Sequence, residues 1–341
     1  MIIFVFLFGL CVGSFVFAFY ERFCAKKPIL QARSFCFKCE KRLKFYHLIP
    51  LLSFIFLRGR CGFCGAKISP LSPFCELLCS LLFVFAFFLS LNAEFNALSG
   101  EFNALNDSKI NVAFGGILNA LNSDFIEILS LIDAQKFTLN FIFLALFLST
   151  VLLLSLIDLK LKAVPETLLW AAFILAFCYS VNLNDIYGFW GEIDGFVLNA
   201  PIFAGLFFLL KSLVSCVLNF KRQNENLESM GEGDILIIAA MGGILGFTKG
   251  FCVIFLAAIL ALPLCMYFKL LESKKAKRVE FLSQGAEFKS KNCELRAINS
   301  STKKEIQAHK GLKIATHSYE LPFIPFLSLA FVLVLALGEF L

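Results

Sequence analysis

The chain has 341 residues, of which 59% are hydrophobic and 16% charged, and its mean hydropathy is +0.81. A soluble domain is far less apolar than this, so the composition excludes one and indicates a membrane protein. The formal net charge of +6 does not indicate a nucleic-acid partner, because the basic residues gather in particular segments between apolar runs.

Apolar runs long enough, or nearly long enough, to cross a bilayer recur along the chain, where a membrane helix needs about 20 residues. They are residues 2–20, 77–91, 139–157, 167–181, 196–210, 235–247, 251–269 and 321–341. The first run lacks a basic segment before it and a small-residue cleavage site, so we expect a retained helix. In the short sixth run, Gly242, Gly243 and Gly246 predict close helix packing. We therefore expect an all-α polytopic protein with about eight transmembrane helices.

The basic residues predict the orientation of these helices. Residues 21–76 contain eleven Lys or Arg against three acids, and residues 273–320 are similarly rich in Lys beside the membrane. The segments 92–138 and 182–194 are mostly acidic or neutral. With eight spans, both basic segments then lie in the cytoplasm and both ends of the chain in the periplasm.

This topology divides the chain into three parts. Residues 1–20 form the first transmembrane helix, residues 21–76 a small cytoplasmic module, and residues 77–341 a membrane domain. Two segments of the membrane domain look inserted. They are a periplasmic loop at 92–138, which contains a short local duplication, and a polar, Lys-rich cytoplasmic loop at 272–320.

Two pairs of cysteines lie in the cytoplasmic module, and two residues separate the members of each pair. Cys36 and Cys39 form the first pair, and Cys61 and Cys64 form the second about twenty residues later. This spacing is typical of a tetrahedral structural zinc site with four cysteine ligands. Disulfides are the alternative, but a reducing cytoplasm disfavours them. The pattern predicts a zinc-binding module with four cysteine ligands, which we call the four-cysteine module.

Two aspartates lie where polar segments meet apolar runs. Asp158 follows the run 139–157, and Asp234 precedes the next short run. Ionisable residues at membrane depth are costly and indicate a functional site. Because the topology puts both at the cytoplasmic face, we expect a paired-carboxylate site; the alternative is that each Asp only marks a helix end. Gly231 and Gly233 allow a positive φ or a close backbone approach beside Asp234.

These motifs, in this order, make the chain resemble the bacterial prepilin peptidases, also called type IV leader peptidases. The resemblance covers most of the chain outside the two inserted segments. It is carried by Gly13-Ser14-Phe15, Ile49-Pro50-Leu51-Leu52-Ser53, the run Leu57 to Gly65 with its second cysteine pair, Pro73, Glu76, Asp158 with Val164-Pro165, Gly231-Glu232-Gly233-Asp234, Met241-Gly242 and Pro322-Phe323-Ile324-Pro325.

The resemblance implies a GxGD aspartyl protease of the bacterial inner membrane. Such enzymes remove the leader of type IV prepilins or type II secretion pseudopilins at the cytoplasmic face. Members with the cysteine segment usually also N-methylate the new N-terminus with S-adenosylmethionine. The resemblance places the catalytic pair on Asp158 and Asp234, with Gly231 and Gly233 in support. The partners that it implies are prepilins or pseudopilins and the lipid bilayer, with no nucleic acid.

The chain departs from the family pattern at several positions. Leu236 stands where the family often has Lys, and Glu166 where Asp often follows Pro165. Phe17 and Leu48 stand where Asn is expected. None of these touches the proposed catalytic pair. Two lie in or near the segment that the resemblance links to methylation, so the resemblance supports cleavage more strongly than methylation.

Two other functions compete with the peptidase. In a proton-coupled transporter, Asp158 and Asp234 would act as a proton relay, but the four-cysteine module would have no role. In a non-catalytic membrane scaffold with a zinc module, the two carboxylates would have no role. Only the peptidase gives both features a function.

Overall fold

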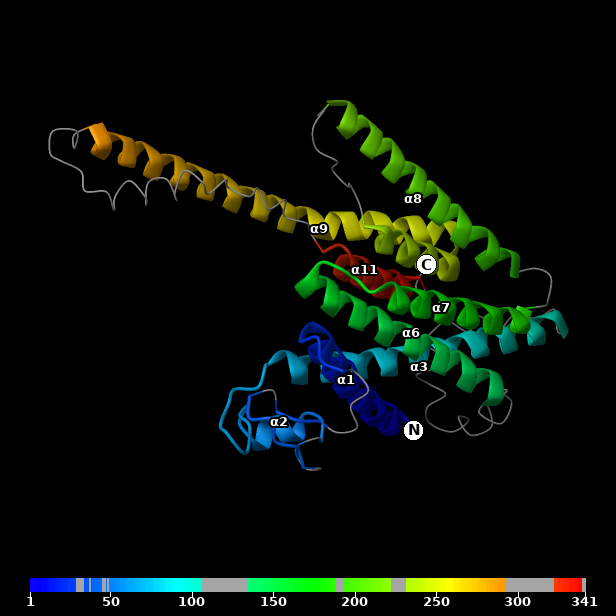
Figure 1. The fold of residues 1–341 in the computed structure, drawn as a ribbon. Coiled ribbons are helices and arrows are strands. Elements are labelled where there is room, and N and C mark those ends of the chain that lie inside the picture. Colours follow the sequence, from blue (N-terminus) through cyan, green and yellow to red (C-terminus); the bar gives the residue numbers. More distant parts are fainter. Residues whose placement is uncertain are drawn as a thin grey trace. The chain divides into compact units, whose positions relative to one another are not determined.

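All regular structure in the described residues is helical (Figure 1), and the pairing outside helices consists of two isolated antiparallel bridges. The computed structural model describes residues 1–28, 34–36, 38–44, 47, 49–105, 134–187, 193–221, 231–291 and 322–338. The helices are α1 (Ile2–Cys24), α2 (Leu52–Phe56), α3 (Leu71–Leu105), α6 (Ala134–Leu161), α7 (Glu166–Tyr187), α8 (Ile193–Lys221), α9 (Glu232–Lys291) and α11 (Ile324–Leu337). The predicted all-α fold is confirmed.

Seven of the eight predicted spans fall within these helices, and the eighth, 321–341, contains α11. By length and composition, α1, α3, α6, α8 and α9 are the five described helices able to cross a membrane, and α7 and α11 contain shorter apolar stretches. Two predicted spans lie within α9, on either side of Gly246, whose φ of 78° and ψ of 178° interrupt the helix. The chain is therefore a multi-pass membrane protein with close to the predicted number of spans.

Several helices run beyond the predicted ends of their spans, and α3 and α9 do so by the most residues. α3 continues to Leu105 and α9 to Lys291, so the segments predicted as loops from residues 92 and 272 begin as helix. Hydropathy marks only the part of a helix that suits lipid, whereas residues such as Glu, Ala, Leu and Lys prolong a helix in polar surroundings. The end of the first predicted loop, residues 134–138, is also helical, because α6 begins at Ala134. Residues 106–133 and 292–320 of the two predicted loops lie outside the described residues.

The chain forms two compact units. The larger contains Met1–Phe255 with Pro322–Leu341, and the smaller contains Leu256–Leu321. In the smaller unit the described structure is the second part of α9, which holds Pro263 within its helix and ends at Lys291. All residues of the predicted sites belong to the larger unit.

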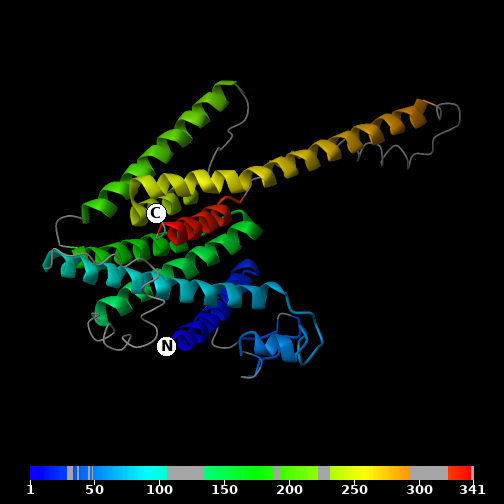
Figure 2. The same ribbon diagram turned by 180° about the vertical axis from the view of Figure 1, so that it is seen from behind.

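Helix α1 crosses α3 at close range (Figures 1 and 2) because glycines line the crossing. A Cβ on Gly9 would lie 2.7 Å from the Cα of Ser80, and a Cβ on Gly13 would lie 2.7 Å from the Cα of Glu76. Two small residues four positions apart let helix backbones meet in this way in membranes. The crossing fixes the start of α3 against the middle of α1.

Helices α6 and α7 pack side by side as a hairpin, and α11 packs along α6 (Figure 1). Lys162, with a φ of 52°, follows the end of α6, and Pro165 precedes α7, so the connection turns sharply. Along α11, the Ser155 and Ser328 hydroxyl oxygens lie 3.1 Å apart across the α6–α11 contact. This polar contact holds the start of α11 near the end of α6.

The glycines of the short sixth span have two different roles. A Cβ on Gly242 would meet the ring of Phe203, and one on Gly243 would meet the ring of Phe196, so both glycines leave room for aromatic side chains of α8. Close packing of the two helix backbones stays a prediction. Gly246 instead provides the positive φ at which α9 is interrupted.

The ends of α1 and α6 meet at one end of the larger unit. Val16, Phe17 and Cys75 pack with Leu153, Leu156 and Ile157 in one buried cluster. Close to this cluster, the Lys160 ammonium lies 5.3 Å from the centre of the Tyr20 ring. The end of α6 that carries Asp158 therefore lies beside the end of α1 that leads into the four-cysteine module.

Candidate functional site

Asp158 lies in the last turn of α6, where its side chain is only 7% exposed. The backbone N–H of Ile324, the first residue of α11, donates a hydrogen bond to its Oδ2 at 3.3 Å. Pro325 follows and has no N–H, so Ile324 supplies the only backbone N–H of the first two residues of α11. The N-terminus of a helix stabilises negative charge, so α11 is placed to hold a carboxylate at this position.

Asp234 lies in the first turn of α9 and interacts electrostatically with Asp158. The structure thus brings together the two carboxylates that the sequence analysis paired, although they come from helices that lie far apart in the chain. We refer to them as the aspartate pair. Asp158 also interacts electrostatically with Lys162, which follows α6.

The two glycines before Asp234 differ in their surroundings. A Cβ on Gly233 would lie 3.0 Å from Cδ1 of the buried Leu169 in α7, so this glycine lets the first turn of α9 approach α7 closely. Among the residues that the structure describes, a Cβ on Gly231 would meet only the Asp234 carboxylate, at 3.6 Å. Neither glycine has a positive φ. The sequence analysis gave two possible reasons for a glycine beside Asp234, a positive φ or a close backbone approach. The structure shows a close approach, and it shows it at Gly233.

The four cysteines of the two pairs come together in the module. The sulfur atoms of Cys36, Cys39, Cys61 and Cys64 all lie within 4.8 Å of one another, and the Cys36 and Cys64 sulfurs are 3.9 Å apart. Tetrahedral zinc with bonds of about 2.3 Å to sulfur separates its ligands by about 3.8 Å. The donor set and its spacing therefore fit a zinc site with four cysteine ligands.

Each cysteine pair sits in the same kind of backbone turn. In the first, the N–H of Cys36 bonds to the carbonyl of Lys41, and the N–H of Glu40 bonds to the carbonyl of Cys36. In the second, Cys61 bonds to Ala66 and Gly65 to Cys61 in the same two ways. One antiparallel bridge closes each turn, Phe35 with Arg42 and Arg60 with Lys67. The two halves of the site are thus equivalent in backbone structure.

The turns differ at the position four residues after their first cysteine, where both require a positive φ. Gly65 has a φ of 68° in the second turn, and Glu40 has a φ of 56° in the first. Glycine adopts this conformation at no steric cost, whereas a residue with a Cβ pays for it. The first turn is therefore the more strained half of the site.

The second turn also prepares one of its sulfurs for a metal. The backbone N–H groups of Phe63 and Cys64 point at the Cys61 sulfur and lower the pKa of this thiol to about 7. A thiolate is the form that binds zinc, so these amides favour the ligating state. The buried Cys75 and Cys79 lie in α3, outside the cluster.

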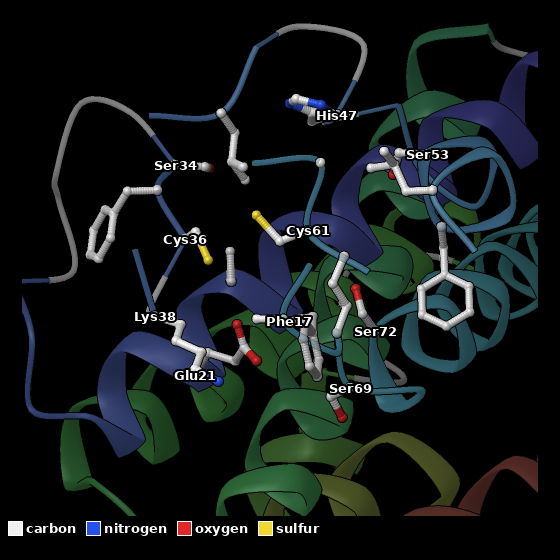
Figure 3. Close-up of a pocket in the computed structure, with 18 of the residues that line it drawn as sticks. Phe17, Glu21, Ser34, Cys36, Lys38, His47, Ser53, Cys61, Ser69 and Ser72 are labelled. Atoms are coloured by element: carbon white, nitrogen blue, oxygen red, sulfur yellow. The ribbon is translucent and has the colours of Figure 1, made fainter. Parts of the chain in front are cut away.

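A cavity of about 730 Å³ lies between α1, the four-cysteine module and the start of α3 (Figure 3). Phe17 and Glu21 of α1 line one wall. Cys36, His47 and Cys61 of the module line another, and Ser72 and Glu76 of α3 complete the lining. Sequence reasoning did not find this cavity.

Two contacts hold the His47 ring in place. The backbone N–H of Lys44 donates a hydrogen bond to its Nδ1 at 3.3 Å, and the Phe63 ring packs edge-on against it.

Glu76 fastens the module to the membrane helices. The N–H of Leu51 donates to its Oε2 at 2.7 Å, and the hydroxyls of Ser14 and Ser72 also hydrogen-bond to the carboxylate. The bond to Leu51 holds that residue at a φ of 58°, just before α2. Glu76 is only 6% exposed, so these donors compensate for burying its charge. Its only sequence signal was its place in the family pattern.

Two family models match the chain. Residues 7–90 match the bacterial Peptidase A24 N-terminal domain, which spans α1, the four-cysteine module and the first part of α3. Residues 142–266 match the type IV leader peptidase family, which spans both members of the aspartate pair. The two matches therefore cover both candidate sites. No solved structure matches the chain.

Several curated relatives carry the name prepilin leader peptidase/N-methyltransferase. The one from Myxococcus xanthus is 46% identical over 81 residues, 24% of each chain, and the one from Bacillus subtilis is 40% identical over 86 residues, 25% of this chain and 35% of the relative. The one from Vibrio cholerae is 27% identical over 216 residues, 63% of this chain and 62% of the relative. Each matched stretch thus spans less than two thirds of the relative's length.

Proposed function

Because the chain belongs to the type IV leader peptidase family, we propose that it is an aspartyl endopeptidase that removes the leader of type IV prepilins or type II secretion pseudopilins. The observation that carries this proposal is the aspartate pair, assembled from α6 and α9 at the end of the larger unit where the four-cysteine module lies. We propose that Asp158 and Asp234 are its catalytic residues.

The surroundings of the two carboxylates support different roles for them. Peptide hydrolysis needs one ionised carboxylate to take a proton from water and one protonated carboxylate to polarise the scissile carbonyl. The N–H of Ile324 and the Lys162 ammonium stabilise charge on Asp158, so Asp158 is the base. Each negative charge disfavours ionisation of the other carboxyl group, so we assign the proton to Asp234, which would polarise the carbonyl.

Zinc has a structural role in this proposal. Cys36, Cys39, Cys61 and Cys64 would hold the ion, which supplies folding free energy that so small a module cannot obtain from a core of its own. The relatives' names also support a second activity, N-methylation of the new N-terminus, for which S-adenosylmethionine would supply the methyl group.

Cleavage is proposed to occur at the cytoplasmic face of the bacterial inner membrane. The basic segments 21–76 and 273–320 support this orientation. A cysteine introduced near Ser290 should be protected from membrane-impermeant thiol reagents in intact cells, and one near Ser108 should be labelled, in a background without exposed native cysteines. Labelling at both positions would contradict the orientation.

The direct test of the function is incubation of the purified protein in detergent with a prepilin. Conversion of the prepilin to its mature size is expected. The transporter makes the opposite prediction, which is proton-coupled uptake by liposomes that contain the protein, without cleavage. Uptake without cleavage would overturn the peptidase proposal.

A further inference from the structure

We propose that the cavity between α1, the four-cysteine module and α3 binds S-adenosylmethionine, with Glu21 facing the positive charge of its sulfonium. This inference rests on the proposed function, because it assigns a binding site to the N-methylation that the proposed function includes. The cavity volume of about 730 Å³ lies within the range of about 300–1,000 Å³ that is usual for small-molecule sites. A nucleoside joined to an amino acid is a ligand of this size class.

The lining matches the mixed chemistry of that ligand. S-adenosylmethionine has a flat aromatic base, a carboxylate and a cationic sulfonium. Phe35 and Phe54 line the cavity, and aromatic side chains are the groups that pack against a flat base. Arg22 and Lys38 also line it and complement a carboxylate, while Glu21 complements a cation. A gap that only separated the module from the membrane helices would not require acidic, basic and aromatic residues in its lining.

Glu21 rather than Glu76 is the carboxylate for the ligand. Glu76 already accepts hydrogen bonds from Leu51, Ser14 and Ser72, so its charge serves to fasten the module. Glu21 is half-buried near the end of α1, on the wall of the cavity that faces the module (Figure 3). Its interaction with Lys160 of α6 is electrostatic and links this wall to the helix that carries Asp158.

The cavity is also close to the place where cleavage would release a new N-terminus. Phe17 lines the cavity and packs in the same buried cluster as Ile157, the residue before Asp158. Phe17 therefore connects the lining of the cavity to the buried cluster at the end of α6. The cavity and the aspartate pair would then serve successive steps at the same end of the larger unit.

The transfer itself requires positive charge to be stabilised in the cavity. The ammonium of the new N-terminus must first lose a proton to water, since an ammonium has no lone pair. Its nitrogen then forms a bond to the methyl carbon while the carbon–sulfur bond breaks, and the electron pair of that bond stays on sulfur. The products are a neutral thioether and a methylated ammonium, so the positive charge moves from sulfur to nitrogen. A carboxylate at the position of Glu21 stabilises the charge before and after transfer.

The test is equilibrium binding of S-adenosylmethionine and of its neutral product, S-adenosylhomocysteine, to the purified full-length protein by calorimetry. Glu21→Gln should lower the affinity for the cationic ligand by about ten-fold and that for the neutral product by less than about two-fold, because the substitution removes charge and little volume. Glu40→Gln is the matched control, since Glu40 is exposed in the same module and does not line the cavity. It should bind both ligands as the unaltered protein does.

A second variant tests the cavity independently of charge. Ala18 lines the cavity from α1, and Ala18→Phe should fill it and abolish binding of both ligands, with zinc content as the check that the module is intact. Undiminished binding by Ala18→Phe would exclude the cavity as the site. Equal loss of both ligands in Glu21→Gln would overturn the placement of Glu21 at the sulfonium. A preparation that cleaves prepilin but binds neither ligand would overturn this inference alone, whereas one that does not cleave prepilin would overturn the proposed function.

Discussion

The four-cysteine module and the aspartate pair are organised on opposite principles. The module draws its four sulfurs from two short turns within residues 36–64, and each turn is closed by its own backbone hydrogen bonds. The aspartate pair is assembled from the end of α6 and the start of α9, with the first amide of α11 as a third component. One site is local in sequence, and the other exists only when distant helices pack correctly.

This difference teaches how each site should fail. Loss of a ligand should loosen the module while the helices that carry the carboxylates keep their own packing. Loss of a carboxylate should stop the chemistry while the module stays folded. A substitution that disturbs the helix packing around Asp234 should lower the cleavage rate without abolishing cleavage. Both carboxylates remain in such a variant, but their positions shift.

The largest expected effect is on cleavage. Asp158→Asn and Asp234→Asn should each lower the rate of prepilin cleavage by about 10³-fold or more, because an amide cannot exchange the proton. Zinc content should stay at the level of the unaltered protein. The measurement is the initial cleavage rate in detergent; substantial cleavage by either variant would remove that carboxylate from the mechanism.

The next effect is on the metal. The unaltered protein should contain about one zinc per chain, and Cys61→Ser should lose most of it and become sensitive to proteolysis within residues 21–76. Cys79→Ser is the matched control, because Cys79 is fully buried in α3 and lies outside the cluster. Metal analysis with limited proteolysis checks both. A zinc-free protein that resists proteolysis in this segment would exclude the structural metal.

A smaller effect is expected from the glycines beside Asp234. Gly233→Val should lower the cleavage rate by about ten-fold or more, because its side chain would displace α9 from Leu169 and shift Asp234. Gly231→Ala should change the rate by less than about three-fold, since its Cβ meets only the Asp234 carboxylate among the described residues, at an ordinary contact distance. Equal rates in the two variants would show that close approach to α7 does not position Asp234.

The smallest effect separates the two halves of the zinc site. Glu40→Gly should make the module more stable by about 0.5–1 kcal/mol, because glycine adopts the positive φ of 56° without strain. Gly65→Ala should destabilise it by about 1 kcal/mol for the converse reason. The rate at which a chelator removes zinc should fall in the first variant and rise in the second. A change of the same sign in both would contradict the equivalence of the two turns.

The sequence predicts the parts of the molecule that depend on local pattern. The cysteine spacing indicated the cluster, since each pair needs only its own turn, and the apolar runs located the helices, because lipid selects for them. The packing depended on particular long-range contacts, such as Gly13 against the Cα of Glu76 or Ile324 against Asp158, which no pattern within one segment reveals. The link from Glu76 to Leu51 and the cavity beside it were missed for the same reason.

The most direct test of the account is to measure zinc content and prepilin cleavage on the same preparations of three proteins. These are the unaltered protein, the double variant Asp158→Asn with Asp234→Asn, and Cys61→Ser. Mass spectrometry of the product should locate the cleavage site. We predict that the double variant contains about one zinc and yields no product, while Cys61→Ser lacks zinc and still yields some product at the correct N-terminus. Correctly cut product from the double variant would contradict the claim that the aspartate pair performs the reaction.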